Sequence, residues 1–198
     1  MKHTASKTFI IWILGALSTI TPLAIDLYLP AFTSIAEYFD TTTSRITLSV
    51  TSYFIGMALG QILYGPLLDR FGRKRPLYAG LVVFIITSVL CAEAKSDSAL
   101  IGFRFLQAIG GSVAWVAAVT MVRDFFPVKE SAKLFSLLIL IIGVSPLLAP
   151  TIGGFIAVAW GWKAIFLIIA GIGLAVLCLV FLFLPHAQPP DITVSLKT

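Results

Sequence analysis

Six long apolar stretches constrain this chain more than any other feature of its sequence. They cover residues 9–29, 46–66, 76–94, 99–121, 134–157 and 164–184. A helix needs about 20 residues to cross the roughly 30 Å hydrocarbon core of a bilayer, and each stretch is close to or above that length. With 59% hydrophobic and 12% charged residues, the composition excludes a disordered chain, a disulfide scaffold and an ordinary soluble enzyme. We therefore expect an all-α integral membrane protein with six transmembrane helices.

The basic residues predict how these helices are oriented. One side of the predicted membrane holds ten of the 14 Lys and Arg residues: Lys2, Lys7, Arg70, Arg73, Lys74, Arg75, Arg123, Lys129, Lys133 and Lys197. The loops on the other side hold Arg45, Lys95 and Lys163. Because Lys and Arg are enriched on the cytoplasmic side of membranes, residues 1–8 and 185–198 are predicted to be a cytoplasmic N-terminus and tail in the inner or plasma membrane. The same placement accounts for the net charge of +5 without a nucleic-acid partner.

Two ionisable side chains lie inside the predicted spans, Asp26 in the first and Arg104 in the fourth. A charge there costs at least about 2.5–3.5 kcal/mol. Both are expected at one level, roughly 5–8 Å below the outer edge of the core. One interpretation is a titratable carboxylate opposite a fixed cation in a cavity between helices. In the other, Asp26 caps a helix break near the interface and Arg104 extends outward to water. The spacing alone favours neither.

Other polar and small residues cluster in the fourth and fifth spans. Gln107 lies one turn from Arg104 on the same helix face, where it can orient the arginine, bind substrate or hold two helices together. The fourth span has a small-residue surface for close packing: Gly110, Gly111, Ser112, Ala114, Ala117 and Ala118. The fifth is expected to kink and to pack tightly because of five residues: Gly143, Pro146, Pro150, Gly153 and Gly154. Helix packing alone can explain most of these positions.

The loop between the second and third spans carries a specific motif. Residues 65–75 read G-P-L-L-D-R-F-G-R-K-R. This resembles, in full, the signature loop G-x-x-x-D-R-x-G-R-[KR]-[KR] of the major facilitator superfamily, and it lies where that family has it. The matching positions are Gly65, Asp69, Arg70, Gly72, Arg73, Lys74 and Arg75.

Three further segments are similar to motifs of that family. Residues 104–110 resemble R-x-x-Q-G-x-G, with Ala108 in place of a glycine. Residues 160–166 resemble the tryptophan-rich entry to helix six, with Lys163 in place of arginine. Residues 145–154 resemble the helix-five antiporter motif G-x-x-x-G-P-x-x-G-G. Its matching residues are Pro150, Gly153 and Gly154, and its replaced glycines are Ser145 and Ala149.

Residues 17–30 are similar to the Bcr/CflA-type (bicyclomycin-resistance) drug:proton antiporters, and the resemblance covers about residues 9–184. It implies the N-terminal six-helix half of a major facilitator fold. It implies that Asp26 binds protons and substrate and that Arg104, with Gln107 beside it, takes part in proton coupling. The resemblance also implies that three residues form a cytoplasmic charge cluster that holds one conformation closed: Asp69, Arg73 and Asp124.

Transporters of this family have twelve spans in two halves, with substrate held between them. The partner surface for Gly65, Asp69 and the helix-five motif is therefore expected from a second half. Three explanations remain for a six-span chain: a fragment or truncated reading frame, pairing with a separately encoded half, or self-association. A parallel homodimer is permitted by symmetry, but a fragment or split half is favoured.

The implied function is proton-coupled efflux of a small drug-like molecule, with the proton gradient as energy source and no cofactor or metal. The alternative is a non-transporting membrane fragment, or a partner subunit that modulates a full-length carrier. An enzyme is disfavoured because the sequence lacks H-E-x-x-H, G-x-S-x-G and Walker A motifs and its histidines are only His3 and His186. Four aromatic residues are candidates to line an apolar cavity, although packing between helices or against lipid explains them equally well: Tyr28, Tyr53, Phe54 and Trp115.

Overall fold

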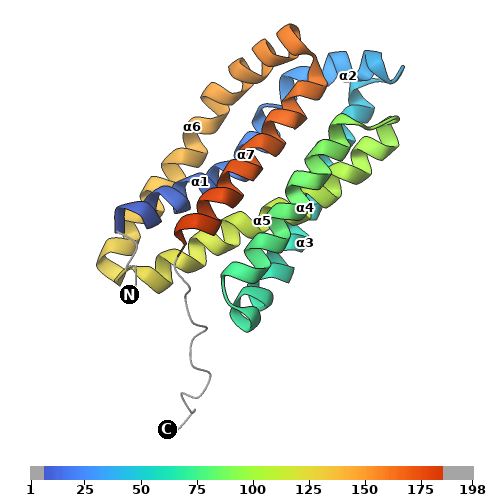
Figure 1. Cartoon of the computed structure of the whole chain (residues 1–198). Helices are drawn as coiled ribbons and strands as arrows, with labels where there is room; N and C mark the ends of the chain where they lie inside the picture. Colours follow the sequence, from blue (N-terminus) through green and yellow to red (C-terminus); the bar gives the residue numbers. More distant parts are fainter. Residues whose placement is uncertain (1–6, 185–198) are drawn as a thin grey trace.

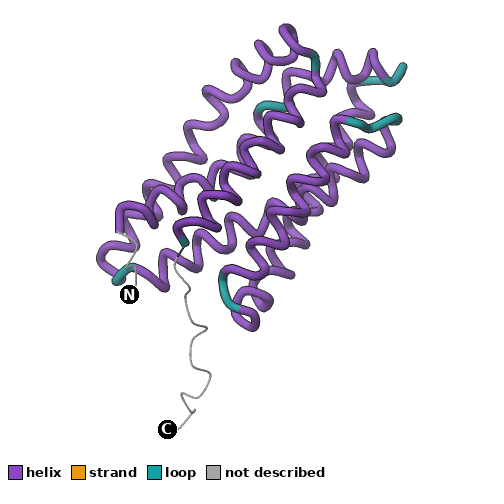
Figure 2. The backbone as a smooth tube through the Cα atoms, in the orientation of Figure 1, coloured by secondary structure: helices purple, strands orange, loops and turns teal. Residues whose placement is uncertain are grey.

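The chain folds into a bundle of long helices (Figure 1). A computed structural model describes residues 7–184, and within that range the chain is helical except at short turns (Figure 2). The elements are α1 (Lys7–Asp26), η1 (Leu29–Ala31), α2 (Phe32–Tyr38), α3 (Thr43–Phe71), α4 (Lys74–Ala92), α5 (Asp97–Phe125), α6 (Val128–Trp160) and α7 (Trp162–Phe183). The prediction of an all-α fold is confirmed. Residues 1–6 and 185–198, which include most of the predicted cytoplasmic ends, lie outside the described residues.

Six helical segments within residues 7–184 are long and apolar enough to cross a membrane, as predicted. The first runs through α1, η1 and α2 as one segment, Phe9–Tyr38, and the others are α3, α4, α5, α6 and α7. Successive spans run in opposite directions, so the bundle has two ends. We call them the Gly72 end, where α3 meets α4, and the Asp97 end, where α5 begins.

Local signals explain where several helices begin and end. The Thr42 side chain accepts a hydrogen bond from the backbone N–H of Arg45 (3.3 Å) at the start of α3. The Ser96 side chain accepts one from the backbone N–H of Ala99 (3.1 Å) at the start of α5. These side chains satisfy amide groups that have no partner within their own helices. Between α3 and α4, Gly72 adopts φ +76°, a left-handed value that favours glycine.

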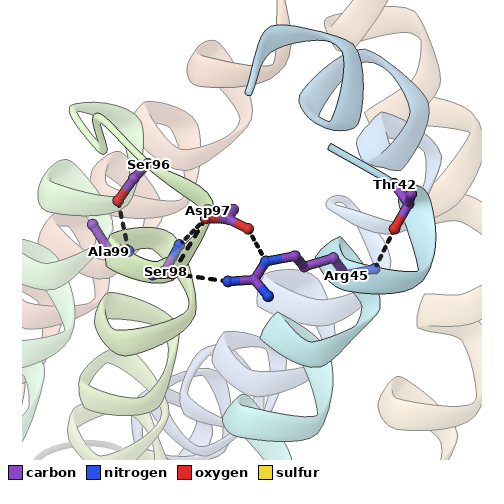
Figure 3. Close-up of polar contacts among 6 residues, drawn as sticks. All are labelled: Thr42, Arg45, Ser96, Asp97, Ser98 and Ala99. Atoms are coloured by element: carbon purple, nitrogen blue, oxygen red, sulfur yellow. Dashed lines mark hydrogen bonds and ion pairs between the residues drawn. The ribbon is translucent and has the colours of Figure 1, made fainter. Parts of the chain in front are cut away.

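An ion pair joins α3 to α5 at the Asp97 end (Figure 3). The Arg45 guanidinium donates hydrogen bonds to the carboxylate of Asp97 and to the hydroxyl of Ser98. The Arg45 side chain is 51% exposed and that of Asp97 17%. This contact therefore links two helix starts at the surface of the bundle.

The packing of the six spans has an internal symmetry. Among the spans, α3 packs on α5 and α1 packs on α6, while α4 packs on α7 and α1 also contacts α5. Exchanging the first span with the fourth, the second with the fifth and the third with the sixth turns the α3–α5 pair into the α6–α1 pair. It maps the α4–α7 pair and the α1–α5 pair onto themselves. The contacts between the spans therefore follow a three-plus-three pattern of the kind found in many transporters.

Close packing of the fourth span, α5, is confirmed. A Cβ atom on Gly110 would lie 2.6 Å from the backbone nitrogen of Phe84 and 2.8 Å from the carbonyl oxygen of Gly80. A Cβ on Gly111 would lie 2.8 Å from the ring of Phe84. Only glycine permits such close approach of α5 to α4.

The prediction of tight packing along the fifth span, α6, is wrong for much of its length. A Cβ on Gly143 would meet nothing within 4 Å, and Leu147 and Phe155 are 74% and 67% exposed. The reason is that α6 contacts mainly α1, η1 and α7, with a smaller contact to α5, and is the least buried of the six spans. Gly153 is an exception, because a Cβ there would overlap the backbone of Leu27. Gly153 thus packs within this chain, although the resemblance had assigned it to a contact with a second half.

Candidate substrate and coupling site

A cavity of about 350 Å³ opens between α1, α3, α5 and α6. Its lining residues are Ser18, Thr21, Pro22, Ile25, Asp26, Phe54, Met57, Gln61, Trp115, Ile142 and Pro146. Asp26 is the one charged side chain among them. Of the predicted aromatic residues, Phe54 and Trp115 line this cavity, whereas Tyr28 and Tyr53 are fully buried elsewhere.

Asp26 is the last residue of α1 and is nearly buried, with 9% of its surface exposed. Its carboxylate accepts a hydrogen bond of 2.7 Å from the hydroxyl of Ser145 on α6. Among the described residues, no ion pair joins Asp26 to Arg104. A carboxylate at the C-terminal end of a helix is unfavourable, because the helix dipole is negative there. The position of Asp26 therefore does not serve the stability of α1.

Arg104 is fully buried inside the bundle. Its Nη1 atom donates hydrogen bonds to the carbonyl oxygen of Ala24 (3.1 Å) and to Oε1 of Gln107 (2.6 Å). The amide of Gln107 in turn donates to the hydroxyl of Ser88 on α4 (2.6 Å). The interpretation in which Arg104 extends outward to water is thus wrong. Gln107 is also fully buried, and it orients the arginine and links two helices while lying away from the cavity.

The end of α1 explains why a cation is accommodated at Arg104. The backbone N–H of Leu27 donates to the carbonyl of Leu23, and that of Tyr28 donates to the carbonyl of Ile25. The intervening carbonyl, that of Ala24, is left without this backbone donor, and Arg104 supplies one from α5. Such carbonyls at a helix C-terminus need a partner, and a cation there is favoured by the helix dipole.

Three aromatic rings surround the Arg104 guanidinium. Its Cζ atom lies 4.2 Å from the ring centroid of Tyr53, 4.7 Å from that of Tyr28 and 5.8 Å from that of Phe166. Ring faces attract a cation more strongly where water is excluded. The Nε and Nη2 atoms make no hydrogen bond within residues 7–184. The rings therefore provide much of the environment of this charge.

The predicted charge cluster is assembled at the Gly72 end. Arg73 donates to Asp124 through Nε (2.7 Å) and Nη2 (3.3 Å) and to Asp69 through Nη1 (2.8 Å). Burial alone would lower the pKa of Arg73, but the hydrogen bonds and charges of Asp124 and Asp69 raise it above its ordinary value. The cluster holds the ends of α3, α4 and α5 together.

The remaining residues of the signature loop are more exposed. The Arg70 guanidinium lies over the ring of Phe71, 5.4 Å from its centroid, and Arg75 is exposed. Lys74 is half-buried at the start of α4. A Cβ on Gly65 would meet nothing within 4 Å, so no contact within the described part of the chain requires a glycine there.

The helix-five motif lies along the contact of α6 with α1 and η1. Ala149 and Gly153 are buried, and Ser145, Pro150 and Gly154 are half-buried. A Cβ on Gly154 would lie 3.7 Å from the Cβ of Pro30, an ordinary contact. The bond from Ser145 to Asp26 and the contacts of Ser88 and Phe166 are not indicated by any sequence motif. These partners come from helices that are distant along the chain, so no local spacing could have indicated them.

A six-span bundle with a carboxylate in its cavity and a charged signature loop is typical of a multi-pass membrane protein of the transporter class. The family profile described as Major Facilitator Superfamily matches residues 14–197. The chain belongs to this superfamily, which consists of transporters and not of enzymes.

Individual relatives agree with this assignment. A bicyclomycin resistance protein homologue of Haemophilus influenzae is 34% identical over 197 residues, which is 100% of this chain and 50% of the relative. The multidrug resistance protein MdtL of Escherichia coli is 34% identical over 182 residues, covering 92% of this chain and 46% of MdtL. This chain thus spans about half the length of these relatives.

A solved structure shows the same fold. It is a bacterial homologue of the human lysosomal transporter Spinster, in an inward-facing and occupied conformation. The TM-score is 0.78 with 19% sequence identity, and the match covers 93% of this chain and 45% of that one. The six helices described here therefore have the fold of half a major facilitator transporter.

Proposed function

We propose that this chain forms the proton- and substrate-binding half of a transporter that exports small drug-like molecules in exchange for protons. The observation that carries the proposal is the Asp26 carboxylate, which lines an otherwise uncharged cavity at the unfavourable end of a helix. A membrane-embedded acid is costly to insert, and helix stability does not account for this one. A role in proton and substrate binding does. The names of the drug-resistance relatives support the same class of function.

The cavity suggests the class of substrate. Apolar and aromatic side chains such as Phe54, Met57 and Trp115 dominate its lining, with a few polar groups such as Gln61 and Thr21. Pockets of this kind bind amphipathic small molecules, with the polar groups fixing their orientation. One carboxylate is compatible with a neutral or a singly cationic solute.

The proposed cycle follows from charge competition at Asp26. When the cavity faces the outside, Asp26 takes up a proton and the solute leaves; when it faces the cytoplasm, the proton leaves and solute binds again. Arg104 and Gln107 support the end of α1 that carries Asp26. In this proposal the Arg73 cluster lies on the cytoplasmic side, as the excess of Lys and Arg at the Gly72 end favours. Both termini are then cytoplasmic.

A second six-helix unit completes the proposed transporter, either as a separate half or as another copy of this chain. The open cavity and the exposed face of α6 support such a partner. The same observations also favour the alternative function, a non-transporting subunit that modulates a full-length carrier. The two differ in whether Asp26 is needed for proton exchange.

The deciding experiment measures drug-induced proton movement in everted membrane vesicles that contain the 198-residue chain. We expect a signal that Asp26→Asn abolishes. The matched control is Asp40→Asn, because Asp40 is exposed, lies outside the cavity and has φ +51°, which asparagine tolerates. A correctly inserted chain without any signal would reject independent transport and leave either a half that needs a separate partner or the modulating subunit. An unchanged signal in Asp26→Asn would reject the proposed role of Asp26 in proton exchange.

A further inference from the structure

The hydroxyl of Ser145 lies at the boundary between two cavities. Asp26, its hydrogen-bond partner, lines the cavity described above. Ser145 lines a second cavity of about 390 Å³ between α1 and α6, together with Thr19 and apolar residues such as Leu23. The bond between the two side chains therefore crosses the contact between α1 and α6. It connects the candidate proton site directly to the most exposed helix of the bundle.

This bond is unusual among the contacts of α6. Within residues 134–157, it is the only side-chain hydrogen bond to another helix, since Ser136 bonds to the carbonyl of Ala132 on α6 itself. The same range has no charged residue. The remaining contacts of this part of α6 with α1 are apolar or involve small residues such as Gly153. A change in the Asp26–Ser145 bond therefore acts on an interface that has no other side-chain hydrogen bond from residues 134–157.

The charged surroundings of Asp26 are simple within residues 7–184. Arg104, on α5, approaches α1 at the Ala24 carbonyl and forms no ion pair with Asp26. On α3, Arg45 is paired with Asp97 at the helix start, and on α7, Lys163 lies over the rings of Tyr38 and Trp162. Ser145 is therefore the direct polar partner of the carboxylate.

We infer that Ser145 is a positioning residue for Asp26: its hydroxyl stabilises the ionised carboxylate and makes the packing of α6 on α1 depend on protonation. The inference rests on the proposed function and deepens it. A hydrogen bond to a carboxylate is roughly twice as strong as one between neutral groups. Proton uptake by Asp26 removes the charge, weakens the bond and loosens α6. Solute release and helix movement are then linked through one side chain.

The test titrates the Asp26 carboxyl itself by infrared spectroscopy of the purified full chain in lipid. The signal is the carboxylic-acid carbonyl band that disappears in Asp26→Asn. We expect Ser145→Ala to change the midpoint of this titration, because the carboxylate loses its hydroxyl donor. Ser145→Thr, which keeps a hydroxyl, should restore most of the shift. Ser136→Ala on the same helix is the matched control and should leave the midpoint unchanged.

An unchanged midpoint in Ser145→Ala would overturn the inference, as would an equal shift in Ser136→Ala. Both results leave proton-coupled transport untouched, because that is judged by vesicle proton movement and Asp26→Asn. Conversely, the expected infrared shift, combined with vesicle proton movement that is the same in Asp26→Asn and the parent, would reject the proposed function while supporting the role of Ser145.

Discussion

Two arginines hold helices together in this protein by opposite means. Arg73, at the Gly72 end, makes hydrogen bonds to two carboxylates, those of Asp69 and Asp124. Arg104, in the middle of the bundle, has no carboxylate partner among the described residues. It binds a backbone carbonyl and the Gln107 amide and lies among aromatic rings. Both side chains are nearly excluded from solvent, so burial alone does not dictate the kind of partner.

The difference between the two arginines affects whether a neighbouring acid is held as a carboxylate. An acid paired with Arg104 would be held as a carboxylate by the neighbouring charge. Neutral oxygens and rings stabilise the guanidinium without fixing the protonation of any acid. Asp26, two residues beyond the carbonyl that Arg104 binds, makes no ion pair within residues 7–184. At the Gly72 end the proposed role is to hold helices in place, and there direct pairing of Arg73 with carboxylates is an advantage.

The largest effect is expected from Arg104→Lys. An ammonium group lacks the planar fork that reaches Ala24 and Gln107 and the flat face that stacks on Tyr28 and Tyr53. We expect a loss of about 2–3 kcal/mol in the free energy of unfolding, measured by SDS titration of the protein in detergent. Arg75→Lys, at an exposed position, is the control and should change little. Equal stability of Arg104→Lys and the parent would show that guanidinium geometry does not matter at this site.

A smaller effect is expected from Asp124→Asn, which removes the charge from the two-bond partner of Arg73. The amide oxygen still accepts one hydrogen bond, so we expect a loss of about 1–2 kcal/mol in the same assay. Asp69→Asn is the matched comparison, because the Asp69 side chain is 70% exposed whereas that of Asp124 is 33% exposed. Exposed ion pairs contribute little to stability, so Asp69→Asn should lower the free energy of unfolding by less than about 0.5 kcal/mol. The reverse order would mean that the i, i+4 pair within the loop is the stronger contact.

The same comparison shows how far the sequence could predict the site. The Arg73 cluster was predictable because its motif is short and contiguous, and only Asp124 comes from elsewhere. The level of Asp26 and Arg104 followed from counting residues along straight helices. Their separation did not, because it depends on the rotation of α5 and on which carbonyl becomes free where α1 ends. The exposed face of α6 likewise could not be predicted from the sequence, because small residues occur both where helices touch and where they do not.

The smallest effect is expected at the Asp97 end, where Arg45 pairs with Asp97 at the surface (Figure 3). Half of the Arg45 side chain is exposed, so water and ions compete for both partners. Arg45→Gln should lower Tm by only about 1–2 °C at low salt, measured by circular dichroism, with Lys95→Gln as the control at the same end. In high salt the difference should vanish, whereas the deficit of Arg104→Lys should remain because ions do not reach the interior. If the loss of Tm in Arg45→Gln persisted in high salt, Arg45 would behave like the buried Arg104. The distinction between surface and buried cations would then be wrong.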